Sequence, residues 1–163
     1  MGRTANYSDQ RCSVAATLEV IGDPWTMLIL RDAFKGVRRF EQWQAGLGVA
    51  RNVLAARLRS LTEHGVLAKR AYCERPLRHE YVLTAKGKEL FSVVMVMLDW
   101  GDRHVYGAGE EPRAYTHLTC GQPLNAQVVC QCCGGALHAR DVRSEEASED
   151  ARTVGQVMAR VEA

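Results

Sequence analysis

The chain has 163 residues, of which 47% are hydrophobic, and a formal net charge of +2. This length suits one domain with a real core, or one domain with a small appendage. The longest apolar run, residues 93–98, is far too short to span a bilayer, and the polar start lacks the apolar segment of a signal peptide, so we expect a cytoplasmic protein without membrane partners.

The first third of the chain predicts three helices. The first covers about 12–21, and "GDP" at 22–24 separates it from a second helix, for which Asp23 can serve as the cap. Trp25 and the aliphatic residues that follow it are expected to point inward. A short third helix covers about 40–47, with glycines at its end. These helices hold no cluster of catalytic residue types.

A fourth helix is predicted over about 50–64. Leu54, Leu58 and Leu61 form one apolar stripe, and the opposite face carries amide, basic and small side chains. A short helix, a tight turn and such a helix are typical of a helix-turn-helix that enters the major groove of double-stranded DNA. The candidate DNA contacts on this helix are Arg51, Asn52, Ala55 and Arg59. The alternative is an ordinary amphipathic surface helix.

A basic hairpin is predicted directly after this helix. Its strands cover 66–72 and 79–84, and "CERPLR" forms the tip. Lys69, Arg75 and Arg78 could contact phosphates or the minor groove, as a wing does. Residues 51–88 hold nine Lys or Arg against three Asp or Glu, which favours a nucleic-acid partner, although a solvated surface would have the same charge.

A long helix, about 85–106, completes the first domain, which we place at 10–106. Its middle is apolar on nearly every side, so we expect it to be buried in a subunit interface. The predicted fold is therefore mainly α with a small β-hairpin wing, a winged helix-turn-helix dimer followed by a small C-terminal segment.

Several stretches resemble the HxlR family of winged-helix transcriptional regulators, which are relatives of the MarR group. They are "CSVAATLEVIGDPWTMLILRDAF", "GVRRFEQWQ", "ARNVLAARLRSLTEHGVLAKRAYCERPLRHEYVLTAKGKEL" and "LDWGD". The resemblance implies a homodimer that binds a palindromic operator, typically a repressor released by a small-molecule inducer or a redox signal. It also implies that 13–36 is dimer scaffold, with Trp25 wedged inside. The chain departs from the family at "GDPW", where "GGKW" is common.

Cys12 stands at the start of the first predicted helix. In the family that the chain resembles, a cysteine at this place can sense oxidants or electrophiles. A helix N-terminus favours the reactive thiolate, which makes Cys12 a possible redox sensor. The alternative is a small apolar residue at a dimer seam. Cys73, near the wing, is taken as incidental.

A linker at 107–113 leads to a Cys-rich segment, 114–143, and a charged tail, 144–163. His117 and Cys120 form one pair with the spacing of a metal knuckle, and Cys130 and Cys133 form another. Three thiolates and an imidazole make a closed tetrahedral zinc site, which could give a segment without its own core a fixed structure. Cys132 and His138 are possible substitutes in this ligand set.

Two other interpretations of the Cys-rich segment remain open, a thiol switch using Cys130, Cys132 and Cys133, or an ordinary turn. A metal- or thiol-based enzyme, or a protein-interaction module, in this segment is the alternative function of the chain. An enzyme would need an open metal position and a general base, and the sequence shows no HExxH or comparable motif. We therefore expect a DNA-binding regulator that is not an enzyme.

Overall fold

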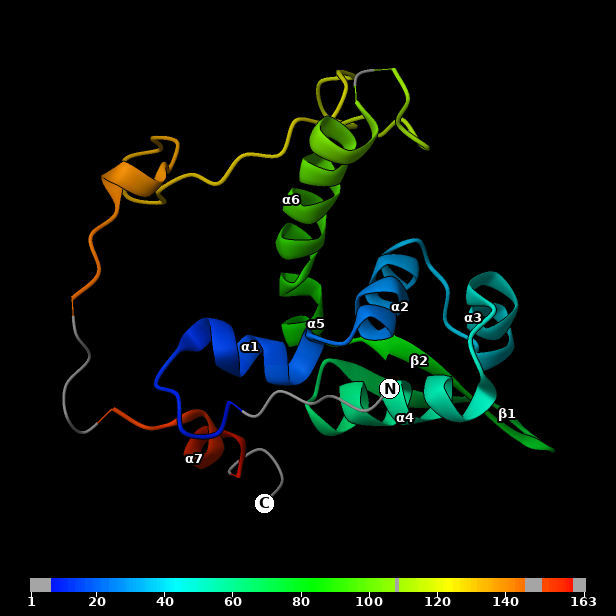
Figure 1. Ribbon diagram of the computed structural model, residues 1–163. Helices are drawn as coiled ribbons and strands as arrows, with labels where there is room; N and C mark the ends of the chain where they lie inside the picture. The colour runs from blue at the N-terminus through cyan, green and yellow to red at the C-terminus, as the bar shows by residue number, and fades with distance from the viewer. Residues whose placement is uncertain (1–6, 108, 146–150, 160–163) are drawn as a thin grey trace. The chain divides into compact units, whose positions relative to one another are not determined.

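The computed structural model describes residues 7–107, 109–145 and 151–159. The chain forms two compact units. The first contains the described residues up to Leu90 together with 151–159, and the second runs from Phe91 to 145. The second unit is thus inserted between two parts of the first (Figure 1).

Four helices build most of the first unit. They are α1 (Ser13–Ile21), α2 (Pro24–Phe34), α3 (Phe40–Leu47) and α4 (Arg51–Glu63). Asp23 caps α2, as predicted, because its Oδ1 accepts hydrogen bonds from the backbone N–H groups of Trp25 at 3.0 Å and Thr26 at 3.3 Å. Gly48, with φ +62°, ends α3 in the left-handed conformation and leaves only a short turn before α4.

Trp43 of α3 lies at the centre of the core of this unit. It is fully buried, and its indole N–H donates to the Ile29 carbonyl at 3.2 Å. Tyr81 packs edge-on against it, with ring centroids 6.1 Å apart. The prediction that Trp25 is wedged inside was wrong, because Trp25 lies in the first turn of α2 and is 36% exposed. The other fully buried large side chains are Ile29, Leu30, Leu54, Leu58, Leu61, Val66 and Leu67.

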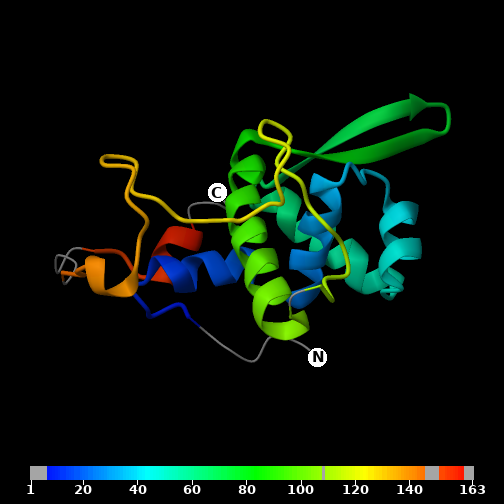
Figure 2. The ribbon, with the colours of Figure 1, turned by 90° about the horizontal axis from the view of Figure 1, so that it is seen from above.

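The wing is an antiparallel hairpin of β1 (Leu67–Glu74) and β2 (Leu77–Leu83). Figure 2 shows it projecting away from the helices of its unit. The predicted strands were too short at the tip, because pairing continues as far as Glu74 and Leu77. At the base, the Tyr81 N–H donates to the Arg38 carbonyl at 2.8 Å, which ties β2 to the loop before α3.

A short helix, α5 (Ala85–Glu89), follows the wing. The Thr84 hydroxyl caps it by accepting from the Gly87 N–H at 3.0 Å, and the same hydroxyl donates to the Gly65 carbonyl at 2.7 Å. One continuous helix over 85–106 was therefore a wrong prediction. The Leu90 N–H donates to the Gly87 carbonyl, three residues back instead of four, and the α-helical hydrogen-bond pattern ends there.

The second unit begins with α6 (Phe91–Gly101), which continues into a π-helical turn, η1 (Asp102–Tyr106). In the rest of this unit, the described residues form only isolated β-bridges and a 3₁₀ turn, η2 (Ala139–Asp141). None of the described residues from 109 to 145 is buried. The Cys-rich segment therefore has no apolar core within the part of it that the structure describes.

A last helix, α7 (Val154–Met158), lies in the range that the sequence suggested was a charged tail. It packs against α1, beside which it lies in Figure 1. The Val154 N–H donates to the Gln10 carbonyl at 2.7 Å, and the Gly155 N–H donates to the Ser8 carbonyl at 2.9 Å. Val154 is 3% exposed. The chain thus returns to its first helix after the inserted unit.

Over the described parts of the chain, no single helix has the length and apolar character needed to cross a bilayer. Only α1 and α2 taken together would have them, and these two helices meet at a bend of 77°.

Candidate nucleic-acid interface

The outer face of α4 is open along its first three turns. Arg51, Asn52, Ala56 and Arg59 are exposed, whereas the leucine stripe on the opposite face is completely buried. Burial of that stripe fixes the rotation of the helix, so the polar face must point outward. Ala55, which was predicted to approach DNA, is half-buried beside the exposed face.

Arg51 is held by α3 at the start of α4. Its guanidinium lies 4.8 Å from the centroid of the Phe40 ring, and its Nη1 donates to the Gln44 Oε1 at 3.4 Å. The stacking and the hydrogen bond restrict the guanidinium while leaving the residue exposed. Arg51 is therefore pre-positioned at the turn between the two helices of the helix-turn-helix.

Arg57 points away from the exposed face. Its Nη2 lies 3.2 Å from Oδ2 of Asp23, and its Nε is buried without a hydrogen-bond partner. By helical periodicity alone, Arg57 would lie at the border of the exposed face. The structure instead uses it to join α4 to the cap of α2, a role for which periodicity gives no signal because it depends on a residue of another helix.

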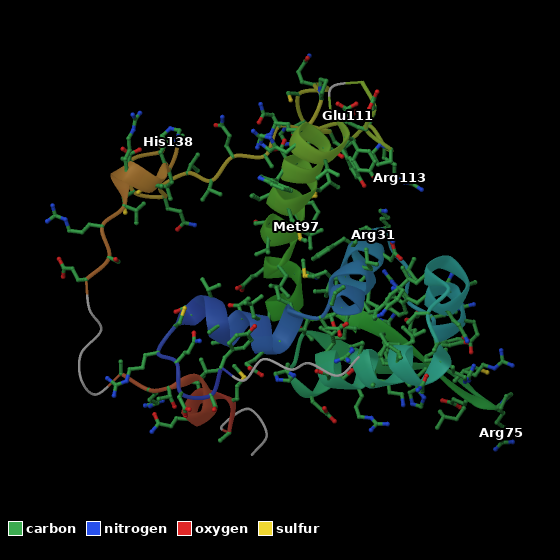
Figure 3. All side chains as sticks on the ribbon, in the orientation of Figure 1. Arg31, Arg75, Met97, Glu111, Arg113 and His138 are labelled. Atoms are coloured by element: carbon green, nitrogen blue, oxygen red, sulfur yellow. The ribbon has the colours of Figure 1, made fainter. Side chains whose placement is uncertain are left out.

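Basic side chains occupy the wing. Lys69, Arg75 and Arg78 are exposed, and Arg75 lies at the far end of the hairpin, directed away from the helices of the unit (Figure 3). Arg70 differs from them, because its Nε donates to the Glu80 Oε1 at 3.0 Å across the hairpin. This hydrogen bond lowers the pKa of Glu80, which therefore stays ionised and offsets the charge of Arg70.

Two arginines that the sequence analysis did not select, Arg38 and Arg39, lie just before α3. Both are exposed, and the Arg39 guanidinium lies 4.5 Å from the centroid of the Tyr72 ring of β1. The pair is part of the stretch "GVRRFEQWQ", which was quoted only for the family resemblance. Because the Arg38 carbonyl accepts the hydrogen bond from the Tyr81 N–H of β2, Arg38 and its neighbour Arg39 lie at the base of the wing.

The arrangement can bind a duplex chemically in two ways. The exposed amide and guanidinium groups of α4 can form hydrogen bonds with base edges in the major groove. The arginines of the wing and of the α3 entry can neutralise phosphates, which carry no sequence information. Both sets of side chains lie in one unit of the structure. Their positive charge complements the negative charge of a nucleic-acid duplex.

Cys12 is exposed and immediately precedes α1. It lines a pocket of about 470 Å³ together with Arg11 and residues of the α7 segment, among them Arg152 and Val157. The thiol is therefore accessible from solvent and shares its pocket with two basic side chains. These are conditions under which a cysteine can react with small molecules.

The predicted metal ligands occur as two separate pairs. His117 Nδ1 lies 3.2 Å from Cys120 Sγ. The Cys130 pKa is lowered by hydrogen bonds from the backbone N–H groups of Cys132 and Cys133 and from the Cys133 side chain. Within the described residues, no group of three or more Cys, His, Asp or Glu side chains converges on one point.

Comparison with known proteins places this geometry among DNA-binding regulators. The model of the family described as HxlR-like helix-turn-helix matches residues 20–108. An uncharacterized HTH-type transcriptional regulator of Mycobacterium tuberculosis is 42% identical over 133 residues, which cover 82% of this chain and 84% of that protein.

Two solved structures show the same likeness. PA1607, a candidate transcription factor, has a TM-score of 0.73 and 42% sequence identity, and the match covers 83% of this chain and 95% of that one. The redox regulator HypR in its reduced form has a TM-score of 0.53 and 30% identity, with 58% of this chain and 96% of HypR covered. The predicted winged helix-turn-helix fold and the predicted family resemblance are confirmed by these matches.

Proposed function

The chain belongs to the HxlR-like helix-turn-helix family of transcriptional regulators, and from this premise we propose that it is a repressor that binds a palindromic operator as a homodimer. The observation that carries the proposal is the exposed polar face of α4 beside the basic wing of the same unit. Asn52 and Arg59 would read bases, while Arg75 and Arg78 would contact phosphates. Arg51 and Lys69 complete the set, and half-buried Ala55 lets the duplex approach.

Dimer formation is supported by the surface of α6. Its apolar side chains include Val93 at 45%, Met97 at 59% and Trp100 at 57% exposure, and several of them line an apolar groove of about 600 Å³. A surface of this kind on a helix marks an interaction site more often than a free face. In a two-fold dimer, two α4 helices would meet two half-sites of a palindrome.

A small-molecule or redox signal would release the operator. Cys12 supports this part of the proposal, because it is exposed at the start of α1 and lines a pocket large enough for a small ligand. One of the matched structures, HypR, is a redox regulator. The protein would act on chromosomal DNA in the cytoplasm, where thiols are kept reduced until an oxidant or electrophile appears.

The test begins with selection of duplexes from a random pool by the reduced full-length protein. We expect enrichment of one inverted repeat whose half-sites lie about one helical turn apart. Binding of that duplex, and of a duplex with one half-site scrambled, is then measured before and after oxidant treatment, with Cys12→Ser as the matched control. If no sequence were enriched, the proposal that the protein binds a specific operator would be wrong. Equal release of wild type and Cys12→Ser would remove the sensor role of Cys12.

A further inference from the structure

The Cys-rich segment contains a tight turn at residues 117–122. The Gly121 N–H donates to the His117 carbonyl at 2.8 Å, and the His117 N–H donates to the Gln122 carbonyl at 2.9 Å. Gly121 has φ +70°, a conformation that L side chains rarely adopt. The turn places the side chains at its first and fourth positions together, which is why His117 Nδ1 and Cys120 Sγ are 3.2 Å apart.

A second turn, at residues 130–135, repeats this pattern bond for bond. The Gly134 N–H donates to the Cys130 carbonyl at 2.7 Å, and the Cys130 N–H donates to the Gly135 carbonyl at 2.9 Å. Gly134 has φ +71°. Cys130 and Cys133 thus take the places of the histidine and the cysteine in the first turn.

The residues on either side of the two turns also correspond. Each turn is closed by an isolated β-bridge and by one further backbone hydrogen bond outside it. The bridges are Thr116 with Pro123 and Val129 with Ala136, and the outer bonds are Leu124 N–H to Tyr115 O and Leu137 N–H to Val128 O, at 2.8 and 2.9 Å. The segment is therefore two copies of one small hairpin, each ending in a pair of metal-ligand side chains.

We infer that the two hairpins bind one zinc ion through His117, Cys120, Cys130 and Cys133. The inference goes beyond transcriptional regulation, because it assigns a structural metal site to a part of the chain outside the winged helix. Zinc–nitrogen and zinc–sulfur bonds of the usual lengths, at a tetrahedral angle, put the two ligand atoms about 3.6 Å apart. In the first turn, His117 Nδ1 and Cys120 Sγ are 3.2 Å apart, which is close to this ligand–ligand distance. Little movement within the turn is therefore needed to bind the ion.

Zinc also accounts for the ordering of a segment that has no core. None of the described residues from 109 to 145 is buried, so the hydrophobic effect cannot hold the hairpins in place. One two-ligand turn cannot complete a tetrahedral site, whereas two such turns supply four ligands. The ion would draw the two hairpins together and provide folding energy that the apolar residues do not.

The repeat also selects among the possible ligands. Cys133 precedes the left-handed glycine, as Cys120 does in the first turn, whereas Cys132 has no counterpart ligand in that turn. His138 lies beyond the closing bridge of the second hairpin, outside the repeated positions. Three thiolates and one imidazole favour zinc over the oxygen-preferring cations.

The test is elemental analysis of the full chain, purified under reduction and without chelator. We expect about one zinc per chain. Cys120→Ser and Cys133→Ser should lower the content to near zero, and the matched variants Cys132→Ser and Cys73→Ser should retain it. Replacement of zinc by Co²⁺ should give the visible absorption of a tetrahedral thiolate site. Hydrogen exchange should show that chelation loosens residues 115–137 and leaves α2 to α4 protected.

Several results would overturn the inference. One is the absence of zinc both as purified and after zinc is added to the reduced protein. Metal absent from Cys132→Ser but kept in Cys133→Ser would refute the ligand set, and one zinc per two chains would refute a site within one chain. If Cys120→Ser lowered protection in α2 to α4 as well, the metal would not be confined to the appended segment, and that part of the inference would fall.

Discussion

Arg57, from the middle of α4, is paired with Asp23 at the cap of α2, with 3.2 Å between Nη2 and Oδ2. The other carboxylate oxygen of Asp23 accepts the two backbone N–H groups that open α2. One carboxylate therefore caps α2 and holds α4 beside it. The half-buried state of both side chains makes this pair stronger than a surface ion pair, because it is less screened by solvent.

Asp23→Ala should destabilise the protein more than Asp23→Asn. Alanine removes the cap, which costs about 0.5–2 kcal/mol, and leaves Arg57 without its partner. Asparagine caps nearly as well and removes only the charge pair, so the difference between the two variants measures the cap. Chemical denaturation of both variants gives the free energies of unfolding. Equal losses would show that the ion pair, and not the cap, is the main contribution of Asp23.

Substitutions on α4 and on the wing should have different effects on DNA binding. Arg59→Ala and Asn52→Ala should reduce discrimination between the operator and a scrambled duplex by about 1–3 kcal/mol if each side chain reads a base. Arg75→Ala and Arg78→Ala should weaken binding to both duplexes alike and reduce the salt slope by roughly 0.9 for each phosphate that is no longer neutralised. Anisotropy titrations at several salt concentrations measure both quantities.

Arg152→Ala is the control for these titrations, because Arg152 is an exposed arginine that lines the pocket at α1 and belongs to neither α4 nor the wing. It should leave affinity and salt slope unchanged. Equal weakening on operator and scrambled DNA for the α4 variants would argue against base reading by that helix.

Gly87→Ala should be strongly destabilising. A Cβ at Gly87 would lie 2.1 Å from the Val66 carbonyl oxygen, which accepts the Thr84 N–H at 3.1 Å. Backbone must move to make room, at a cost of about 1–3 kcal/mol. Gly46→Ala is the matched control, since Gly46 lies in α3 and an added Cβ there meets open space, so it should stabilise by about 0.5–1 kcal/mol. Thermal unfolding of both variants measures these effects. A Gly87→Ala variant that unfolds at the wild-type temperature would contradict this account.

Met97→Glu should convert the proposed dimer into monomers. The carboxylate would stand in the apolar groove of α6, where burial in an interface would leave it without a partner. Val142→Glu is the control, because Val142 has the same 59% exposure and does not belong to α6. Sedimentation at micromolar concentration should give twice the chain mass for wild type and Val142→Glu, and one chain mass for Met97→Glu. A wild type that sediments as a monomer yet binds the whole palindrome tightly would contradict the dimer.

Local patterns predicted α4 well, because Leu54, Leu58 and Leu61 recur at helical spacing and their burial fixes which face is open. The same reasoning failed for Trp25, which is exposed, whereas Trp43 is the tryptophan that fills the core. Both stand on apolar helix faces, and only the packing of α3 against α2 decides which ring enters the core. The break at Leu90 was not predicted either, because leucine favours helices and gives no signal that a helix ends.

The parts of the candidate site that sequence missed depend on contacts between distant residues. Arg57 would belong to the exposed border by periodicity, and its pairing with Asp23 removes it. Arg39 lies near the wing because its guanidinium stacks on the ring of Tyr72, which is thirty-three positions later in the chain. Charge counting found the basic region but could not separate these roles, since it treats Arg70, paired with Glu80, like the exposed cations at the tip.

The docking of α7 on α1 has a consequence for the order in which the protein folds as it is synthesised. The ribosome releases α1 to α5 early, but the backbone hydrogen bonds of Val154 and Gly155 to Gln10 and Ser8 need residues made after the whole inserted unit. These bonds join residues far apart in the sequence, and closing so long a loop is slow. A nascent chain should therefore hold a formed helix-turn-helix while the surface of α1 that packs against α7 is still exposed, and the pocket at Cys12 forms only when α7 arrives.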